Sequence, residues 1–278
     1  MRVRIMTACK MNQARSPFAE SVLKLHFPQA QVSSAGVEAN SGTPYLPEVV
    51  EVARRWGLEI ADGYSISIIE QGLPTIDTRI VCAEEYMGES IASLGFKGEI
   101  VCYENIVPDP SFMPRDPVGY RGRALESELA KVAFANIWGA RNYDKNLNVH
   151  DITVIVPEGE RNVDAAIDRA FTEANYSGAL VIDGDLRSPI IREIKNRNLR
   201  VGPLTDGIDH LEFDLLSNFI EHQSPERTLL DPSWGSRIRT IANVRPVVII
   251  TAPQLISSGP LPDCYLAAAV ANRVIIIR

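Results

Sequence analysis

The chain has few of the residues that several classes of protein depend on. Its 278 residues include only four cysteines, and 7% of its residues are aromatic. The cysteines are widely scattered, at Cys9, Cys82, Cys102 and Cys264. Such spacing suits neither a disulfide framework nor a zinc knuckle. We therefore expect free thiols in a reducing, cytoplasmic compartment.

Basic residues and long apolar runs are also scarce. The 28 Lys and Arg residues are outnumbered by 35 Asp and Glu residues, which leaves a net charge of −7. This balance argues against broad nucleic-acid binding, because that activity needs a basic face. No apolar run approaches the roughly 18 residues of a membrane span. The first residues, MRVRIMTA, also lack the long apolar region of a signal peptide, so we expect no membrane partner.

Strand and helix patterns alternate through the first half of the chain. Residues 2–8 form a short β-rich run, and residues 16–27 follow with apolar residues at helical spacing. The alternation continues with predicted strands at 30–36, 77–83 and 98–104 and predicted helices at 47–57, 84–95 and 124–140. This β-α-β order predicts an α/β fold, with a parallel sheet covered by helices on both faces.

A polar stretch at residues 140–151 is the best candidate for a domain boundary. We place one domain at 1–145 and a second α/β domain at 146–278. The second half restarts the alternation, with predicted strands at 152–157, 178–184, 199–204, 245–253 and 273–278 and predicted helices near 162–175, 188–197, 209–222 and 262–271. The stretch 222–245 has no clear strand or helix pattern, and we expect it to form a lid or a domain contact.

The segment between the first strand and the first helix, residues 9–17, reads CKMNQARSP. Helix N-termini attract anions, because they carry unpaired N–H groups and a partial positive charge. That field favours the thiolate form of Cys9, which is the nucleophilic form. Arg15 adds a planar cation that matches two phosphate oxygens, and Ser16 can donate a hydrogen bond to the sulfur. Asn12 tolerates the left-handed backbone that a tight loop needs.

A buried cysteine in front of an ordinary helix is the competing interpretation, because both features are common. The position of the segment between the first strand and the first helix favours the reactive loop. Residues 9–20, CKMNQARSPFAE, also resemble the active-site signature of low-molecular-weight protein tyrosine phosphatases, C-x-x-N-x-x-R-S-x-x-A-E, at every fixed position. The resemblance extends over about residues 1–140, through the segments SSAG, DTRIVCAEEYM and VPDP.

This resemblance implies a flavodoxin-like fold for the first half and the activity of a cysteine-dependent phosphomonoester hydrolase. It assigns Cys9 as the nucleophile, Arg15 as the ligand of the phosphoryl group, and Ser16 as the support of the thiolate. The residues of the phosphate-binding loop would be Lys10, Met11, Asn12, Gln13, Ala14 and Arg15. No metal or cofactor would be required, because the loop amides and the arginine meet the charge of the transition state.

Two Asp-Pro pairs compete for the role of general acid. Asp109, in VPDP, resembles the family motif and lies directly after a predicted strand. Asp116, in RDPVG, is a second Asp-Pro pair in the same loop. We favour Asp109 as the group that protonates the leaving oxygen and then activates the hydrolytic water. A simple turn is the alternative interpretation for either pair, because Asp-Pro is common in turns.

The departures from the family pattern bear on the substrate. Lys10 and Met11 stand where the family usually has Thr-Gly, and Ala14 replaces a second loop cysteine found in many members. Lys10 can bring positive charge to the rim of the site. Ser111 stands where an aromatic residue often follows the Asp-Pro motif. The predicted substrate is therefore a phosphotyrosine protein or a small phosphomonoester.

Two other functions remain open at this point. Arsenate reductases use a related loop with a cysteine relay, and Cys82 lies near where a relay would begin. No cysteine follows in residues 83–95, so we expect Cys82 and Cys102 to be buried strand residues. A non-catalytic phosphate-binding or protein-interaction module is the other alternative, although pure binding needs no nucleophile.

The second half resembles no family that we can name. We expect it to select substrate, to regulate the enzyme or to form a homo-oligomer. Acidic residues gather in two of its segments, at Asp183 and Asp185 and at Asp206, Asp209, His210, Glu212 and Asp214. They could form a metal or phosphate site at strand ends, but helix caps and turns explain acidic residues more simply. Arg237, Arg239 and Arg245 lie close together and fit a solvated face best.

Overall fold

A computed structural model describes residues 3–60, 63–141, 152–158, 162–177, 180–183, 225–243, 246–251 and 262–278. The chain divides into two compact units, Met1–Val149 and His150–Arg278. In the part of the chain that the structure describes, no helix is both long enough and apolar enough to cross a membrane.

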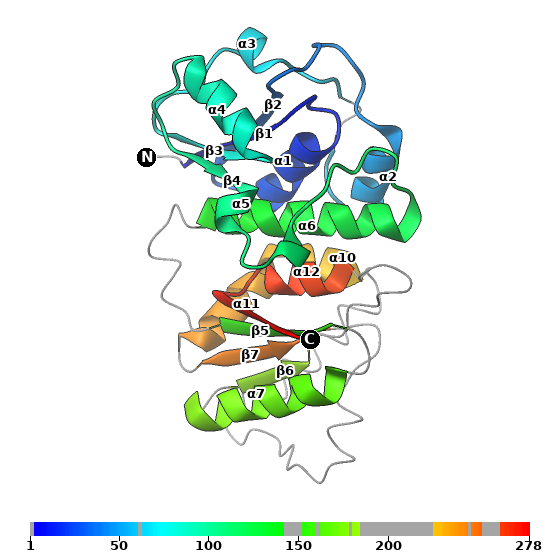
Figure 1. The fold of residues 1–278 in the computed structure, drawn as a ribbon, viewed down its shortest axis with the longest axis vertical. Coiled ribbons are helices and arrows are strands. Elements are labelled where there is room, and N and C mark those ends of the chain that lie inside the picture. Colours follow the sequence, from blue (N-terminus) through cyan, green and yellow to red (C-terminus); the bar gives the residue numbers. More distant parts are fainter. Residues whose placement is uncertain are drawn as a thin grey trace. The chain divides into compact units, whose positions relative to one another are not determined.

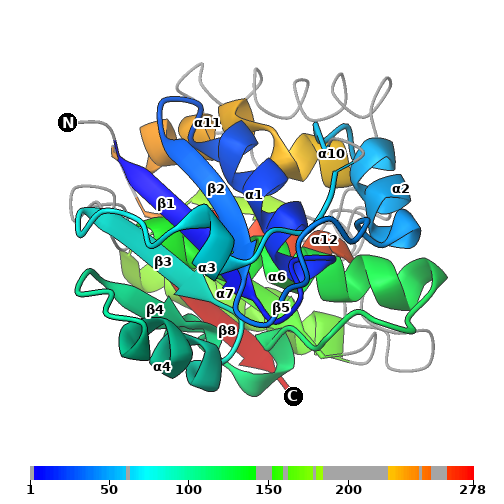
Figure 2. The ribbon, with the colours of Figure 1, turned by 90° about the horizontal axis from the view of Figure 1, so that it is seen from above.

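The first unit is built on a four-stranded parallel sheet. Its strands are β1 (Arg4–Cys9), β2 (Gln31–Gly36), β3 (Thr78–Cys82) and β4 (Ile100–Cys102), in the order β2-β1-β3-β4. Figure 2 shows these four strands side by side. The order matches the flavodoxin type of doubly wound sheet, whose ligands bind at the carboxyl ends of the strands. The flavodoxin-like parallel sheet predicted for the first half is therefore confirmed.

Helices cover both faces of this sheet. Helices α1 (Arg15–His26) and α6 (Gly122–Arg141) pack against each other beneath the sheet in Figure 1, and α4 (Glu85–Ser93) packs on β3 and β4 above it. The remaining helical elements of the unit are α2 (Pro47–Arg55), α3 (Ile68–Gln71), α5 (Tyr103–Ile106) and the 3₁₀ turn η1 (Pro110–Phe112). Aromatic pairs fill the core, such as Phe112 with Phe134, whose ring centroids are 4.8 Å apart.

One predicted strand of the first unit is shorter than expected. The pattern predicts a strand at 98–104, whereas β4 ends at Cys102 and α5 begins at Tyr103. The reason is the side chain of Tyr103, which is buried and accepts a hydrogen bond from Asn136 of α6. That contact directs the chain away from the edge of the sheet and toward α6.

The second unit carries another parallel sheet. Its strands are β5 (Ile152–Pro157), β6 (Leu180–Asp183), β7 (Val247–Ile250) and β8 (Arg273–Ile277), in the order β6-β7-β5-β8. The described helices are α7 (Val163–Ser177), α10 (Pro225–Leu230), α11 (Pro232–Ala242) and α12 (Pro262–Ala268). Ile155, Ile167 and Ile250 lie in the core between α7 and the sheet.

The stretch 222–245 differs from the expectation of a long irregular segment. It contains α10 and α11, and Asp231 caps α11 by accepting a hydrogen bond from the Ser233 backbone N–H at 2.8 Å. The strand predicted at 199–204, the helices predicted at 188–197 and 209–222, and the acidic residues Asp185, Asp206, Asp209, His210, Glu212 and Asp214 lie outside the described residues. Arg245 lies outside them as well.

Candidate active site

The loop between β1 and α1 is held at the carboxyl end of the first sheet. Asn12 has φ of 52°, in the left-handed region, and it is the one non-glycine residue with positive φ in the described part of the chain. Its side-chain amide donates to the hydroxyls of Ser16, at 2.9 Å, and Ser34, at 3.0 Å. Its carbonyl oxygen accepts from the backbone N–H of Ile66 at 2.8 Å. Asn12 therefore ties the loop to β2 and to the 63–67 segment.

Cys9 and Ser16 meet at the start of α1. Cys9 ends β1 and is 4% exposed, and its Sγ lies 3.0 Å from Oγ of Ser16. The backbone carbonyl of Ser16 accepts a hydrogen bond from Thr7 at 2.8 Å, which fixes the helix start against the strand. Ala14 occupies the N-cap position and its side chain cannot cap the helix. The N–H groups of the first turn of α1 therefore face the loop, where they can bind an anion.

Arg15 is the buried cation of the loop, at 3% exposure. Its Nη1 donates to Oε1 of Glu84 at 2.7 Å, and its Nη2 lies 3.7 Å from Oδ2 of Asp116. Burial by itself would lower the pKa of Arg15, but Cys9, Glu84, Tyr103 and Asp116 outweigh burial and raise this pKa above its usual value. The guanidinium therefore stays charged beside the thiol.

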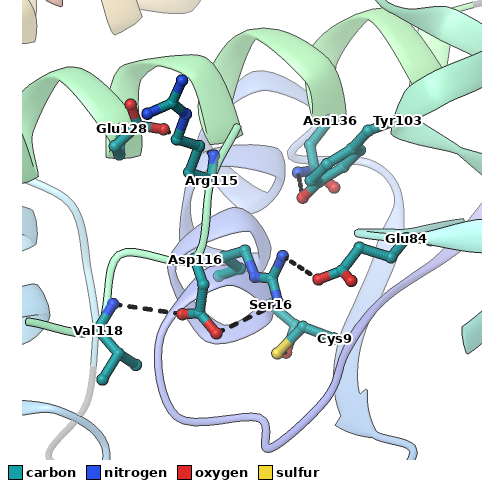
Figure 3. A network of polar contacts seen from close by, with 10 residues as sticks. Cys9, Ser16, Glu84, Tyr103, Arg115, Asp116, Val118, Glu128 and Asn136 are labelled. Atoms are coloured by element: carbon teal, nitrogen blue, oxygen red, sulfur yellow. Dashed lines mark hydrogen bonds and ion pairs between the residues drawn. The ribbon is translucent and has the colours of Figure 1, made fainter. Parts of the chain in front are cut away.

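Glu84 is a site residue that the motif comparison does not find. It lies two residues beyond the carboxyl end of β3 and directly before α4, and it contacts Arg15 across the loop (Figure 3). The sequence could have indicated Glu84 through its position. It follows β3, which pairs with β1, and the carboxyl ends of neighbouring parallel strands lie at the same edge of a sheet.

Tyr103 and Asn136 form a buried polar pair near Arg15. The Asn136 amide donates to the Tyr103 hydroxyl at 2.7 Å, and it also donates to the Val132 carbonyl at 2.8 Å. Burial raises the pKa of Tyr103, and the positive charge of Arg15 lowers it by a smaller amount. The hydroxyl therefore remains protonated. Figure 3 shows this pair beside the loop, with Asn136 reaching from α6.

The two candidate acids lie in different settings. Asp109 caps η1, and its Oδ1 accepts from the backbone N–H of Ser111 at 2.9 Å. Asp116 lies further along the same loop, is 56% exposed at its side chain, and makes the contact with Arg15. Its Oδ1 accepts from the backbone N–H of Val118 at 3.2 Å (Figure 3). Asp109 is the candidate nearer to β4 in the sequence, but it lies at the start of η1. Asp116, which follows η1, is the carboxylate that approaches Arg15.

The rim of the loop is less basic than its sequence suggests. Nζ of Lys10 lies 3.3 Å from Oε2 of Glu38, and both side chains are about half exposed. The hydrogen bond with Glu38 raises the pKa of Lys10. Tyr86, on α4, is partly exposed and lies close enough to Lys10 and Glu38 for their charges to affect its pKa. The rim therefore offers a salt-bridged Lys10 together with an aromatic side chain.

Cys82 and Cys102 are buried strand residues, as the sequence predicts. They are opposite each other in the register of β3 and β4. The hydrogen bond between their thiols raises the pKa of Cys82, which burial raises further, and lowers that of Cys102. All four cysteines are free thiols. In the ranges that the structure describes, no group of three or more His, Cys, Asp or Glu residues is placed to hold a metal ion.

Comparison with known proteins finds one family whose model matches the part of the chain that carries this site. Residues 4–103 match the family model described as low molecular weight phosphotyrosine protein phosphatase. The family resemblance predicted for the first half is therefore confirmed, and the match does not cover the second half. The loop, with its cysteine, arginine and serine, lies inside the matched range.

Particular relatives come from bacterial sources. The chain is 40% identical over 58 residues to the probable low molecular weight protein-tyrosine-phosphatase EpsP of Ralstonia nicotianae, and equally to that of Ralstonia solanacearum. These 58 residues are 21% of this chain and 40% of each relative, so the chain spans less than half the length of the curated relatives that it matches.

Two tyrosine phosphatases are among the solved structures that resemble this chain. AmsI of Erwinia amylovora is 20% identical with a TM-score of 0.43, and the match covers 51% of this chain and 93% of that chain. Wzb of Escherichia coli K30, determined in complex with sulphate, has the same identity and TM-score, with coverage of 51% of this chain and 99% of that chain.

Proposed function

We propose that the first unit is a cysteine-dependent phosphomonoester hydrolase that acts through a phosphocysteine intermediate. The observation that carries this proposal is the buried meeting of a thiol, a serine hydroxyl and a guanidinium at one helix N-terminus. Sγ of Cys9 lies 3.0 Å from the Ser16 hydroxyl, and Arg15 is held beside it by Glu84. This arrangement supplies a nucleophile together with the positive field that a phosphoryl group requires.

The proposed first step transfers the phosphoryl group to Cys9. The thiolate sulfur attacks the phosphorus while the bond from phosphorus to the ester oxygen breaks. Arg15 and the N–H groups of the loop bind the phosphoryl oxygens, whose charge must be met during transfer. A carboxylic acid gives its proton to the leaving oxygen, so the alcohol leaves as a neutral molecule.

The proposed second step returns the enzyme to its starting state. The carboxylate left by the first step takes a proton from a water molecule as that water attacks the phosphorus. The bond between sulfur and phosphorus breaks, which releases inorganic phosphate and restores the thiolate. Ser16 supports the thiolate in both steps through its hydrogen bond at 3.0 Å.

We assign Asp116, and no longer Asp109, as the acid and base of this cycle. Oδ2 of Asp116 lies 3.7 Å from Nη2 of Arg15, the residue proposed to bind the phosphoryl group, and the exposure of Asp116 leaves it accessible to a substrate. Asp109 has a capping role in η1 that accounts for its position. The sequence favours Asp109 and leaves Asp116 as the alternative, and the proposal here takes the alternative because of its contact with Arg15.

Separate replacement of the two aspartates by Asn distinguishes them. We expect Asp116→Asn to lower kcat/KM for phenyl phosphate by about 10²-fold or more, the usual effect of losing a general acid. Asp109→Asn retains the shape of the cap and is the matched control, with kcat/KM close to that of the unaltered chain. A larger loss at Asp109 than at Asp116 would restore the original assignment.

Gly36 at the end of β2 gives the loop its room. A Cβ added there would lie 2.8 Å from the Lys10 carbonyl oxygen and 2.9 Å from the Asn12 backbone nitrogen. Gly36→Ala must therefore displace the loop, and we expect kcat/KM for an aryl phosphate to fall by about 10²-fold, because small displacements of catalytic groups are costly. Ser33→Ala, on the same strand, is the control. Unchanged kinetics in Gly36→Ala would show that the loop tolerates the displacement.

The proposal also covers the substrate class, the cellular compartment and the role of the second unit. A phosphotyrosine protein is the first substrate class, supported by the family description of the matched residues and by the aromatic Tyr86 near the rim. A small phosphomonoester is the second class. Four free cysteines fit a reducing, cytoplasmic compartment. For the second unit we retain the roles of substrate selection, regulation or homo-oligomer formation.

Hydrolysis of an activated aryl phosphate by the full chain tests this proposal. The expected result is release of the phenol with inorganic phosphate in equal amounts. If the chain hydrolyses no member of a broad panel of phosphomonoesters but binds inorganic phosphate, it is a phosphate-binding module and the hydrolase proposal fails.

A further inference from the structure

Helix α6 carries a buried ion pair that the proposed chemistry does not use. Glu128 is 6% exposed and Lys131 is 8% exposed, and Oε1 of Glu128 lies 3.1 Å from Nζ of Lys131. Carboxylates are rarely buried to this extent unless a partner supplies the opposite charge. Apolar residues would pack at two buried positions with no electrostatic cost, so the presence of two charges calls for a reason.

The second oxygen of Glu128 supplies that reason. Oε2 accepts a hydrogen bond from the backbone N–H of Arg115 at 2.7 Å. Figure 3 shows Glu128 reaching from α6 toward Arg115, with Asp116 next along the chain. A hydrogen bond to an ionised carboxylate is shorter and stronger than one between neutral groups. The backbone directly before Asp116 is therefore fastened to the longest helix of the unit.

The position of the Asp116 carboxylate depends on the backbone that carries it. The Asp116 side chain is more than half exposed, and its hydrogen bond to the Val118 N–H lies within its own turn. Such a bond shapes the turn but does not fix the turn relative to the catalytic loop. The flanking residues Pro114 and Pro117 are buried and restrict the backbone further. The hydrogen bond from the Arg115 N–H to Glu128 links this turn to α6.

We propose that Glu128 is a positioning residue that holds Asp116 at the distance from Arg15 that proton transfer requires. Lys131 supplies the charge that keeps the buried carboxylate compensated. This inference rests on the proposed function, in which Asp116 protonates the leaving group. It also adds to that function, because the support comes from α6, outside the phosphate-binding loop.

Leaving-group dependence separates positioning from a general effect on folding. A poor leaving group, as in phenyl phosphate, needs the proton from Asp116, whereas 2,4-dinitrophenyl phosphate releases a stable anion that needs none. We expect Glu128→Ala to lower kcat/KM for phenyl phosphate by about tenfold or more, since misplacement of a catalytic group is costly. The value for 2,4-dinitrophenyl phosphate should change by less than about twofold, because phosphate binding is intact.

Two further variants protect this test from a folding failure. Glu128→Gln keeps an acceptor for the Arg115 N–H and should recover part of the loss. The double variant Glu128→Leu with Lys131→Leu removes both buried charges together, a change that is often neutral for stability. It also removes the acceptor, so it should show the same leaving-group split as Glu128→Ala. Inhibition by inorganic phosphate should be unchanged in all three variants.

The matched control is Glu126→Gln, the same chemical change two residues earlier on α6. Glu126 pairs with Arg55 at 2.6 Å, and this change should affect neither ester. In an Asp116→Asn background, Glu128→Ala should cause no further loss on phenyl phosphate, because the two changes act on one step.

Equal losses on the two esters, no loss on either, or full additivity with Asp116→Asn would each overturn the positioning role. If the unaltered chain hydrolyses neither ester, the proposed function fails first, and this inference falls with it.

Discussion

Cys9→Ser should abolish hydrolysis of aryl phosphates, with a fall in kcat of at least about 10⁴-fold, the scale seen when a nucleophile is removed from a catalytic unit. The physical reason is the weak nucleophilicity of a serine hydroxyl, which does not ionise near neutral pH as a thiol does. The measurement is steady-state release of inorganic phosphate from 4-nitrophenyl phosphate by the full chain.

Binding should survive this change. Arg15 and the N–H groups of the loop remain in place, so Cys9→Ser should still bind inorganic phosphate, as measured by calorimetry. Cys102→Ser is the matched control, because Cys102 is a buried thiol on the same sheet. It should keep its activity. Residual turnover in Cys9→Ser within about tenfold of the unaltered chain would rule out Cys9 as the nucleophile.

Arg15→Lys should lower kcat/KM by about 10³-fold, near the lower end of the effect of transition-state arginines in phosphoryl transfer. The variant keeps the positive charge and loses the planar fork that binds two phosphoryl oxygens at once. The fork is also what allows Arg15 to contact Glu84 through Nη1 and approach Asp116 through Nη2. Kinetics with 4-nitrophenyl phosphate measure the loss in catalysis, and inhibition by inorganic phosphate measures the loss in phosphate binding.

Arg55→Lys is the control for this prediction. Arg55 pairs with Glu126 on the surface at 2.6 Å, and a lysine there should leave kcat/KM unchanged because surface pairs contribute little. Activity of Arg15→Lys within about tenfold of the unaltered chain would contradict the bidentate role of the guanidinium.

The sequence predicts the parts of the first unit that short-range patterns determine. The predicted helix at 124–140 is α6, and the predicted helix at 16–27 is α1, each displaced by one or two residues at its ends. The loop from Cys9 to Arg15 could be located because its chemistry is continuous in sequence. Asn12 in that loop adopts the left-handed backbone that its residue type allows.

Contacts between distant segments could not be predicted in this way. Glu84, just beyond β3, contacts Arg15 although the two residues are 69 positions apart in the sequence. Glu128 of α6 accepts a hydrogen bond from the backbone N–H of Arg115, which lies in a loop. The choice between Asp109 and Asp116 also depends on how η1 turns the chain, and neither Asp-Pro pair encodes that turn by itself. The end of β4 at Cys102 depends on the hydrogen bond between Asn136 and Tyr103.

Detection of a phosphoryl group on Cys9 during turnover is the most direct test of the central claim. The full chain carrying Asp116→Asn is mixed with 4-nitrophenyl phosphate and quenched within its first turnover, because the loss of the base slows hydrolysis of the intermediate. Peptide mapping should then find the phosphoryl group on the sulfur of Cys9. Phenol release in the first turnover with Cys9 unmodified, or with the phosphoryl group on another residue, would contradict the mechanism.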